Sequence, residues 1–181
     1  MAQAKLKQKF FDVEIPILKK ETQLYAYNLD ELNGRTIKYD LTRLLRGKSV
    51  LLSMNVKVEG NKAFAYPKEF VILPYFIRRI FRKGTNYVED SFYAETKDSK
   101  VEVKPFFITR KKVSRAVRKA LRDRAREEIK NYLKNKDTKT IFDEIIQSRM
   151  QKPLSLKLKK IYPLSLCEIR VFRVEKMIES E

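Results

Sequence analysis

The sequence predicts an α+β fold: a strongly twisted antiparallel sheet or small β-barrel with one embedded helix, followed by a C-terminal helical segment. Two observations indicate this class. Strand-like segments with alternating apolar and polar residues dominate the first 108 residues, and helical periodicity dominates residues 114–161. A last strand-like segment follows, and we expect it to return to the sheet and tie the elements together.

The N-terminal part of the chain predicts strands separated by turns. The first strand spans Phe10–Ile17 and is ended by Pro16, because proline cannot donate a hydrogen bond to a β-ladder. Asn33-Gly34 is a turn signal, and the residues after it alternate cleanly between apolar and polar side chains. We therefore expect a half-buried strand at Arg35–Leu41.

The next elements are a β-hairpin and the embedded helix. Gly60 separates strands at Ser49–Val58 and Lys62–Tyr66, since glycine readily adopts the positive φ of a tight turn. Apolar residues at helical spacing then predict an amphipathic basic helix over residues 73–83, which Gly84 closes.

A second hairpin is expected at Thr85–Thr96 and Lys100–Ile108, around the turn Lys97-Asp98-Ser99. Pro105 predicts an edge position or a bulge in its second strand. The alternation of the first strand assigns its side chains to two faces. The expected inward residues are Val88, Phe92 and Ala94, and the expected outward residues are Glu89, Ser91 and Tyr93.

Three helices and a closing strand are predicted for the C-terminal part. Ser114 is a suitable N-cap for a long helix that runs to about Leu133. Its expected apolar row consists of Val117, Leu121, Ala125, Ile129 and Tyr132. Shorter helices are expected at Thr140–Ser148 and Leu154–Ile161, and the last strand at Ser165–Glu175.

No repeat or linker divides the sequence, so we expect a basic N-terminal arm over residues 1–9 and a single α+β domain over residues 10–178. The alternative is an N-terminal β domain that ends near Ile108, followed by a helical C-terminal region.

Composition limits the classes of function. Lys and Arg number 41 against 23 Asp and Glu, a formal net charge of +18, while 43% of residues are hydrophobic. A chain of this kind is expected to fold and to bind a polyanion. Cys167 is the only cysteine, which excludes an intramolecular disulfide and thiolate-rich metal centres, and we expect it to be a buried apolar residue on a strand.

Other absences argue against catalysis. The chain has no histidine, the usual acid, base or metal ligand near neutral pH. Its four glycines are too far apart for a phosphate-cradling loop. Adjacent carboxylates, Glu89 with Asp90 and Glu127 with Glu128, point in different directions on a strand or helix, which disfavours metal chemistry. We expect no catalytic residue, metal, cofactor or small-molecule substrate.

The sequence does not predict membrane insertion or secretion. The longest apolar run, Phe70–Ile77, is eight residues long and contains Pro74, whereas a spanning helix needs about 20 residues. The first nine residues lack the apolar core of a secretion signal. A cytosolic location is expected.

The most informative stretch is Arg110–Arg126, where nine of seventeen residues are Lys or Arg and only Asp123 is acidic. On a helix its cations share an arc next to the apolar row, without the interspersed Glu residues that usually relieve repulsion on a solvated helix face. A basic face exposed only to water is the alternative. Further basic clusters lie in the arm and at three other places in the chain. The candidate RNA-binding residues are Lys5, Lys7, Lys9, Arg35, Arg43, Arg46, Lys48, Arg78, Arg79, Arg82, Lys83, Arg110, Lys111, Lys112, Arg115, Arg118, Lys119, Arg122, Arg126, Lys159 and Lys160.

Phosphate contacts alone do not distinguish RNA from DNA. No helix-turn-helix, zinc finger or basic zipper pattern is present, and scattered basic clusters suit a surface wrapped by folded RNA. Tyr66, Tyr87 and Tyr93 are candidates for stacking on unpaired bases, although most aromatic residues are expected in the core. The alternatives are a free-standing nucleic-acid-binding protein without sequence specificity and an RNA-processing enzyme that holds a metal on paired carboxylates.

Several segments, in order along nearly the whole chain, resemble a known family. They are Lys9-Phe10-Phe11-Asp12-Val13 before Pro16, Gly34-Arg35, Leu73–Arg82 with Thr96-Lys97-Asp98, Ile161-Tyr162-Pro163-Leu164, Ile169-Arg170 and Val174. With the Ile161-Tyr162-Pro163 stretch as the most specific piece, the sequence resembles the small-subunit ribosomal protein family of archaea and eukaryotes known as S3Ae, or eS1.

The resemblance implies a non-catalytic structural protein on the platform of the small ribosomal subunit, bound to rRNA near the mRNA exit and next to other ribosomal proteins. It leaves a contact with mRNA open. The sequence departs from the family pattern in its short basic extension, in Phe10 where the family usually has Trp, and at Ala65–Ile72. The lack of a long C-terminal tail indicates an archaeal-type member.

Overall fold

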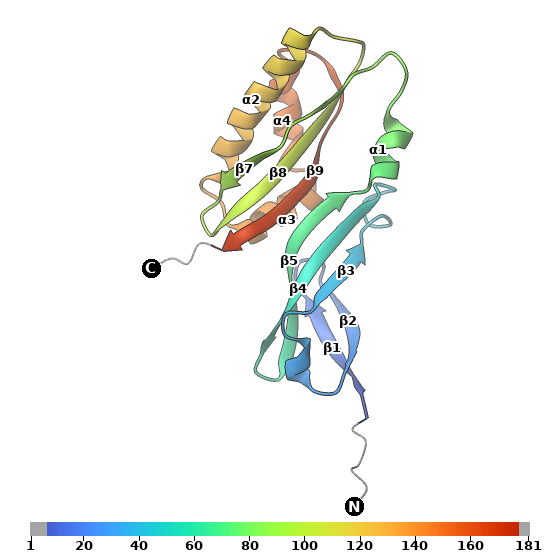
Figure 1. The fold of residues 1–181 in the computed structure, drawn as a ribbon, viewed down its shortest axis with the longest axis vertical. Helices are drawn as coiled ribbons and strands as arrows, with labels where there is room; N and C mark the ends of the chain where they lie inside the picture. The colour runs from blue at the N-terminus through green and yellow to red at the C-terminus, as the bar shows by residue number, and fades with distance from the viewer. Residues whose placement is uncertain (1–6, 178–181) are drawn as a thin grey trace, which may run out of the picture. The chain divides into compact units, whose positions relative to one another are not determined.

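The computed structural model describes residues 7–177, which form a mixed nine-stranded sheet with four α-helices and one short 3-10 helix (Figure 1). The main strand order is β2-β1-β5-β9-β8-β6, with β4 paired to β3 and β5, and β7 paired to β8. The α+β class and the returning last strand are confirmed. The sheet is not closed, so the expected small barrel is wrong, and it is not wholly antiparallel.

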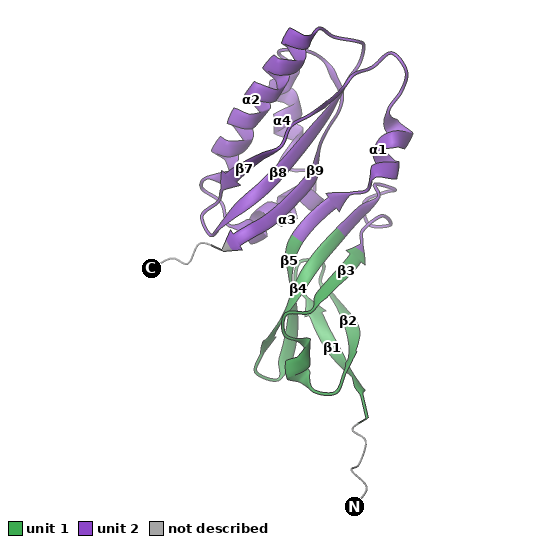
Figure 2. Ribbon diagram, in the orientation of Figure 1, with its two compact units in different colours: residues 1–39, 52–68 green, residues 40–51, 69–181 purple. Residues whose placement is uncertain are grey.

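The chain divides into two compact units (Figure 2). Unit 1 comprises residues 1–39 and 52–68, and unit 2 comprises residues 40–51 and 69–181. The long strands β4 and β5 each contribute residues to both units.

Unit 1 is built mainly from strands. Its elements are β1 (Lys9–Ile15), β2 (Lys20–Ala26), the 3-10 helix η1 (Leu29–Leu32), most of β3 (Thr36–Asp40), and parts of β4 (Val50–Glu59) and β5 (Lys62–Ile72). Strand β1 pairs antiparallel with β2 but parallel with β5, where Val13 lies opposite Ala63. This parallel pair corrects the antiparallel prediction, because β1 and β5 are distant in sequence and no turn between them fixes their direction.

Two turns of unit 1 follow the sequence prediction. Gly60 has a φ of +62° between β4 and β5, and Gly34 has a φ of +81° before β3. Both angles lie in the left-handed region that glycine adopts without steric cost. The expected hairpin and the expected strand after Asn33-Gly34 are therefore confirmed, whereas β2 was not predicted.

Unit 2 combines a curved antiparallel set of strands with the four helices. Its elements are α1 (Pro74–Ile80), β6 (Tyr87–Glu89), β7 (Phe92–Glu95), β8 (Ser99–Thr109), α2 (Arg115–Leu133), α3 (Thr138–Ile146), α4 (Gln151–Leu158) and β9 (Leu164–Met177). Strand β8 lies between β6 and β7 on one side and β9 on the other. The register shifts between Lys104 and Pro105, so the predicted bulge is confirmed, and the edge position is wrong.

Side chains of the second predicted hairpin face as expected. Val88, Phe92 and Ala94 are buried, while Ser91 and Tyr93 are exposed and Glu89 is half-buried. The hairpin's first strand is interrupted, so that β6 and β7 each pair with β8. Cys167 is buried on β9, as predicted, and burial raises the pKa of its thiol.

Helix α2 is positioned by its cap and by its apolar row. The Ser114 side chain accepts a hydrogen bond from the Val117 backbone N–H, which satisfies one of the free donors of the first turn. The buried residues of α2 are Leu121, Ala125, Ile129 and Leu133, while Val117 and Tyr132 of the predicted row are half-buried. With this row buried, α2 packs against β6, β7 and α4.

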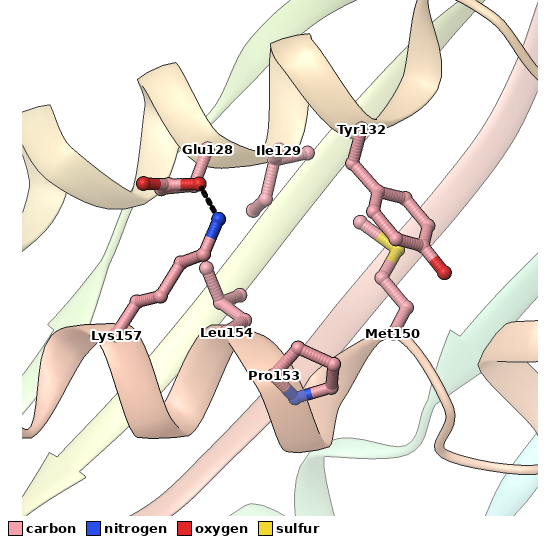
Figure 3. A pocket seen from close by; sticks show the side chains of 7 residues that line it. All are labelled: Glu128, Ile129, Tyr132, Met150, Pro153, Leu154 and Lys157. Atoms are coloured by element: carbon pink, nitrogen blue, oxygen red, sulfur yellow. Dashed lines mark hydrogen bonds and ion pairs between the residues drawn. The ribbon is translucent and has the colours of Figure 1, made fainter.

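A second contact fastens α2 to α4. A small hollow of about 40 Å³ lies between the two helices, and an ion pair between Glu128 and Lys157 spans one end of it (Figure 3). Tyr132 and Met150 lie at the other end. A space of this size accommodates little more than a water molecule, so it serves as a packing contact.

The apolar row of α2 gives a stability prediction. Replacing the fully buried Leu121 with Ala is expected to lower the free energy of unfolding by about 2–5 kcal/mol, because a cavity remains beneath the helix. Urea denaturation measures the change. Lys119→Ala on the exposed face is the control and should alter it by less than about 0.5 kcal/mol. Equal effects of the two substitutions would show that α2 does not contribute to the core through this row.

Candidate nucleic-acid interface

The loop from β8 to α2 presents three exposed cations, Arg110, Lys111 and Lys112, on a fixed backbone. The buried Thr109 hydroxyl donates a hydrogen bond to the Lys111 carbonyl at 2.7 Å and accepts one from the Asn86 backbone N–H at 2.9 Å. Such contacts hold the loop in one conformation, so that less ordering remains to be done when a ligand binds.

Asn86 also supports the C-terminal end of this loop. Its side-chain oxygen Oδ1 accepts a hydrogen bond from the Val113 backbone N–H at 2.7 Å, just before α2 begins. Asn86 itself follows the segment with Arg82 and Lys83, which are exposed. Through its backbone and side chain, Asn86 therefore connects the segment that contains Arg82 and Lys83 to the loop between β8 and α2.

The segment after α4 lies next to this loop. The Arg110 backbone N–H donates to the Pro163 carbonyl at 3.4 Å, and Thr109 lies opposite Leu164 in the ladder of β8 and β9. The exposed Lys159 and Lys160 come shortly before Pro163. One end of the β8–β9 ladder thus carries the loop cations together with the start of α2.

The first turns of α2 present Arg115, Arg118 and Arg122 toward a hollow of about 280 Å³, which Tyr87, Val88 and Glu89 of β6 complete. In the described part of the chain, none of the three arginines forms an ion pair. Lys119, on the same helix, is exposed and also unpaired among those residues. We name Arg110, Lys111, Lys112, Arg115, Arg118, Lys119 and Arg122 the α2 basic edge.

Other cations of α2 are compensated by carboxylates. Arg126 donates two hydrogen bonds to Asp90, from Nε at 3.0 Å and from Nη2 at 2.8 Å, and these raise the pKa of its guanidinium. Arg124 pairs with Glu128 at 2.7 Å and with Glu127 at 3.4 Å. Arg126, a predicted RNA-binding residue, therefore already holds an anionic partner, unlike the arginines of the α2 basic edge.

A second group of predicted cations lies around a wide groove of about 740 Å³ formed by residues 44–48, α1 and residues 147–152. Arg79 donates to the Gly47 carbonyl at 2.9 Å, and its guanidinium lies 5.4 Å from the centre of the Phe76 ring. Lys48 forms an ion pair with Glu168 and donates to the Ser148 hydroxyl at 3.3 Å. Two of the groove's cations are therefore engaged within the protein.

The remaining predicted cations are distributed over both units. Arg43, Arg46 and Arg78 are exposed in unit 2. In unit 1, Lys7 and Lys9 are exposed at the start of β1, while Arg35 donates to the Tyr25 carbonyl at 3.0 Å and lies 3.8 Å from Glu31. Lys5 lies outside the described residues.

The aromatic candidates differ in their environments. Tyr93 is 55% exposed, but the Tyr87 ring stacks on Phe106 with centroids 5.7 Å apart, and Tyr66 donates to Glu59 at 3.0 Å. An exposed aromatic pair that sequence reasoning missed is Phe10 with Tyr25, whose centroids are 4.9 Å apart across β1 and β2. A prediction of β2 would have placed these two residues opposite each other across the strand pair.

Sequence reasoning also missed the residues that shape the interface without being part of the basic run. Asn86 and Thr109 hold the loop, and Glu89 is bound by Arg170 of β9 rather than by an arginine of α2. Asn86 falls within the predicted strand Thr85–Thr96, so no local signal points to its role in holding the loop. The pairing of Glu89 with Arg170 spans 81 positions and has no local signature.

The structure offers little for other chemistry. Within residues 7–177, no three His, Cys, Asp or Glu side chains gather as metal ligands would. Among the helices of that range, none combines the length and the apolar composition that crossing a membrane requires.

Comparison with known proteins connects the chain to a family. Residues 3–177 match the profile of the Ribosomal S3Ae family. The chain is also similar to curated archaeal proteins named small ribosomal subunit protein eS1. The relative from Nanoarchaeum equitans is 25% identical over 178 residues, which cover 92% of this chain and 88% of the relative. The relative from Pyrobaculum arsenaticum is 26% identical over 156 residues, 83% of this chain and 71% of the relative.

The unpaired arginines of α2 give a prediction about salt dependence. Replacing Arg115, Arg118 and Arg122 together with Ala is expected to weaken binding to structured RNA of unrelated sequences. The slope of log K against log salt concentration should become shallower by up to about 2, since each phosphate contact contributes roughly 0.7–0.9. Filter binding over a salt series measures the slope.

The matched control removes three cations farther along the chain, with Ala at Arg124 and Lys130 of α2 and at its C-cap residue Lys134. It lowers the net charge equally, so a general charge effect would give the same slope in both variants. That result, or an unchanged slope in the first variant, contradicts the role assigned to the three arginines.

Asn86 gives a second prediction. Asn86→Ala removes the acceptor of the Val113 N–H, so the amide hydrogen of Val113 should exchange faster with solvent. RNA binding should weaken by about two- to tenfold, because the loop must then be ordered on binding. Hydrogen exchange and affinity are measured on the same protein, with the exposed Asn131→Ala as control. Unchanged exchange at Val113 would refute the support provided by Asn86.

Proposed function

Because the chain belongs to the Ribosomal S3Ae family, we propose that it is a structural constituent of the small ribosomal subunit, bound to rRNA on the platform near the mRNA exit. Its affinity comes from many contacts between Lys or Arg side chains and phosphates. The family consists of ribosomal proteins and is non-enzymatic, which agrees with a chain that lacks histidine.

The observation that carries the proposal is the α2 basic edge. Its seven cations have no carboxylate partner in the described chain, although other cations nearby, such as Arg124 and Arg126, have one. The loop that bears three of them is fixed by Thr109 and Asn86. Uncompensated cations on a rigid framework supply phosphate contacts with little ordering cost, as affinity for a folded RNA requires.

The other predicted cations extend this surface in the proposal. Arg43, Arg46, Arg78, Arg82 and Lys83 are exposed in unit 2 and supply further phosphate contacts. Arg35, Lys48, Arg79 and Arg126 contribute less, because each is engaged within the protein. The N-terminal arm with Lys5, Lys7 and Lys9, and the organisation of residues 10–178 as one RNA-binding domain, stay predictions.

Small-subunit rRNA and neighbouring small-subunit ribosomal proteins are the proposed partners, in the cytoplasm. Direct contact with mRNA is left open. The exposed aromatic residues Phe10, Tyr25 and Tyr93 provide additional surface for a partner, since aromatic rings stack on unpaired bases and also pack at protein interfaces.

Association with ribosomal particles tests the proposal. The native protein is expected to sediment with small ribosomal subunits in a sucrose gradient at moderate salt, and to crosslink to their rRNA. A protein that stays at the top of the gradient while binding RNA and DNA alike would be a free-standing nucleic-acid-binding protein. Metal-dependent cleavage of RNA by the pure protein would instead indicate a processing enzyme.

A further inference from the structure

We propose that the hollow between β6 and α2 is a site for one phosphodiester group of the RNA backbone, held by Arg115, Arg118 and Arg122. This inference rests on the proposed function, because RNA supplies the phosphodiester. It adds that the α2 basic edge is not a uniform layer of charge. One phosphate is taken into a shaped site, and the others are bound at the surface.

The first argument is a hydrogen-bond donor without an acceptor. The Nε atom of Arg118 is buried from solvent and has no hydrogen-bond partner in the structure. A buried donor left without an acceptor is destabilising, and more so when it belongs to a charged group. Since Arg118 lines the hollow, a side-chain rotation that brings Nε to an anionic oxygen placed there would remove this cost.

The second argument concerns Glu89, the only carboxylate among the residues that line the hollow. Nη1 of Arg170 donates to both of its oxygens, at 2.7 and 3.0 Å, and the Tyr87 hydroxyl donates to Oε2 at 2.9 Å. Glu89 is thus neutralised from the sheet side, by residues of β6 and β9. Arg115, Arg118 and Arg122 therefore remain available for an external anion.

Tyr87 adds no negative charge to the hollow. Burial, together with the hydrogen bond to Glu89, raises the pKa of its phenol, so the hydroxyl stays protonated. The charge of the lining is therefore three guanidinium groups against one carboxylate that already has its own guanidinium. A lining with a net positive charge and a hydrogen-bond donor shielded from water favours the binding of an anion.

The third argument is the shape of the donors. A guanidinium group is a planar fork that donates pairs of hydrogen bonds to the oxygens of phosphate. Arg115, Arg118 and Arg122 succeed one another on one helix face, so three forks can approach the oxygens of one group from adjacent turns. The volume of about 280 Å³ falls just below that of typical sites for whole small-molecule ligands, which favours a phosphate with part of its nucleotide.

The direct test observes the Arg118 Nε–H by NMR in the full-length protein with 15N-labelled arginine. The probe is dimethyl phosphate, the smallest phosphodiester, and acetate serves as the carboxylate comparison. We expect a saturable shift of the Arg118 Nε–H resonance with dimethyl phosphate and a much weaker response to acetate. The Nε–H of Arg124 is the internal control, because carboxylates already occupy that side chain.

Three results would overturn the inference. They are an unmoved Arg118 resonance, equal shifts at Arg118 and Arg124, and equal responses to dimethyl phosphate and acetate. The last would indicate a site for a carboxylate of a protein. Sedimentation with small subunits tests the proposed function separately, so a protein that binds the ribosome without a phosphate response at Arg118 contradicts the present inference alone.

A second test treats Arg170 as a positioning residue. In Arg170→Met, Glu89 loses its partner, and its carboxylate should pair with the arginines of α2 and fill the hollow. Binding of structured RNA should weaken about tenfold, as expected when charge-assisted hydrogen bonds to one phosphate are lost.

The double variant with Glu89→Gln and Arg170→Met removes the competing carboxylate, and most of the affinity and of the Arg118 response should return. A merely structural role of Arg170 predicts no recovery in the double variant, and that outcome would refute the positioning role. Thermal denaturation verifies that both variants are folded. If Arg170→Met does not fold, the titration of the unmodified protein still decides the question.

Discussion

The burial of one row of α2 determines where the cations of that helix point. Leu121, Ala125, Ile129 and Leu133 are all buried. A helix with such a row has one orientation about its own axis, because any rotation would expose apolar area that is worth about 25 cal/mol per Å². This orientation turns the side chains of Arg115, Arg118 and Arg122 toward β6. The position of the positive charge is thus set by the hydrophobic core.

Carboxylates then decide which of the cations remain available. A chain with a net charge of +18 repels itself, and local acidic partners relieve part of that repulsion. Asp90 forms an ion pair with Arg126. Glu128 pairs with Arg124 and Lys157, and Glu168 pairs with Lys48. Inside unit 2, these pairs connect α2 to the loop between β6 and β7, α2 to α4, and the segment before β4 to β9. Seven of the cations that such pairs leave out lie together at the start of α2 and in the loop before it, where a polyanion can take the place of the missing acids.

Local signals in the sequence were sufficient for most elements of the fold. Ser114 with the period of α2, Gly60 between two strand-like runs, and the alternation around Val88 and Phe92 each specify their element without help from distant residues. The second strand, Lys20–Ala26, escaped prediction because only Ala26 is buried along it, so its pattern is weak. The parallel pairing of β1 with β5 and the interior position of Pro105 depend on residues far apart in the chain.

The same limit applies to the candidate site. Composition indicated the basic run, but the partners of Arg126 and Glu89 lie 36 and 81 positions away, and only the fold reveals which charges are free.

The place of β9 in the sheet has a consequence for biosynthesis. Residues of this strand are synthesised after those of β5 and β8, yet the strand lies between the two in the sheet. Until residues 164–177 emerge, β8 lacks one neighbour, and Arg110 lacks the carbonyl of Pro163. The nascent protein therefore completes the support of its α2 basic edge only after residues 164–177 have been made.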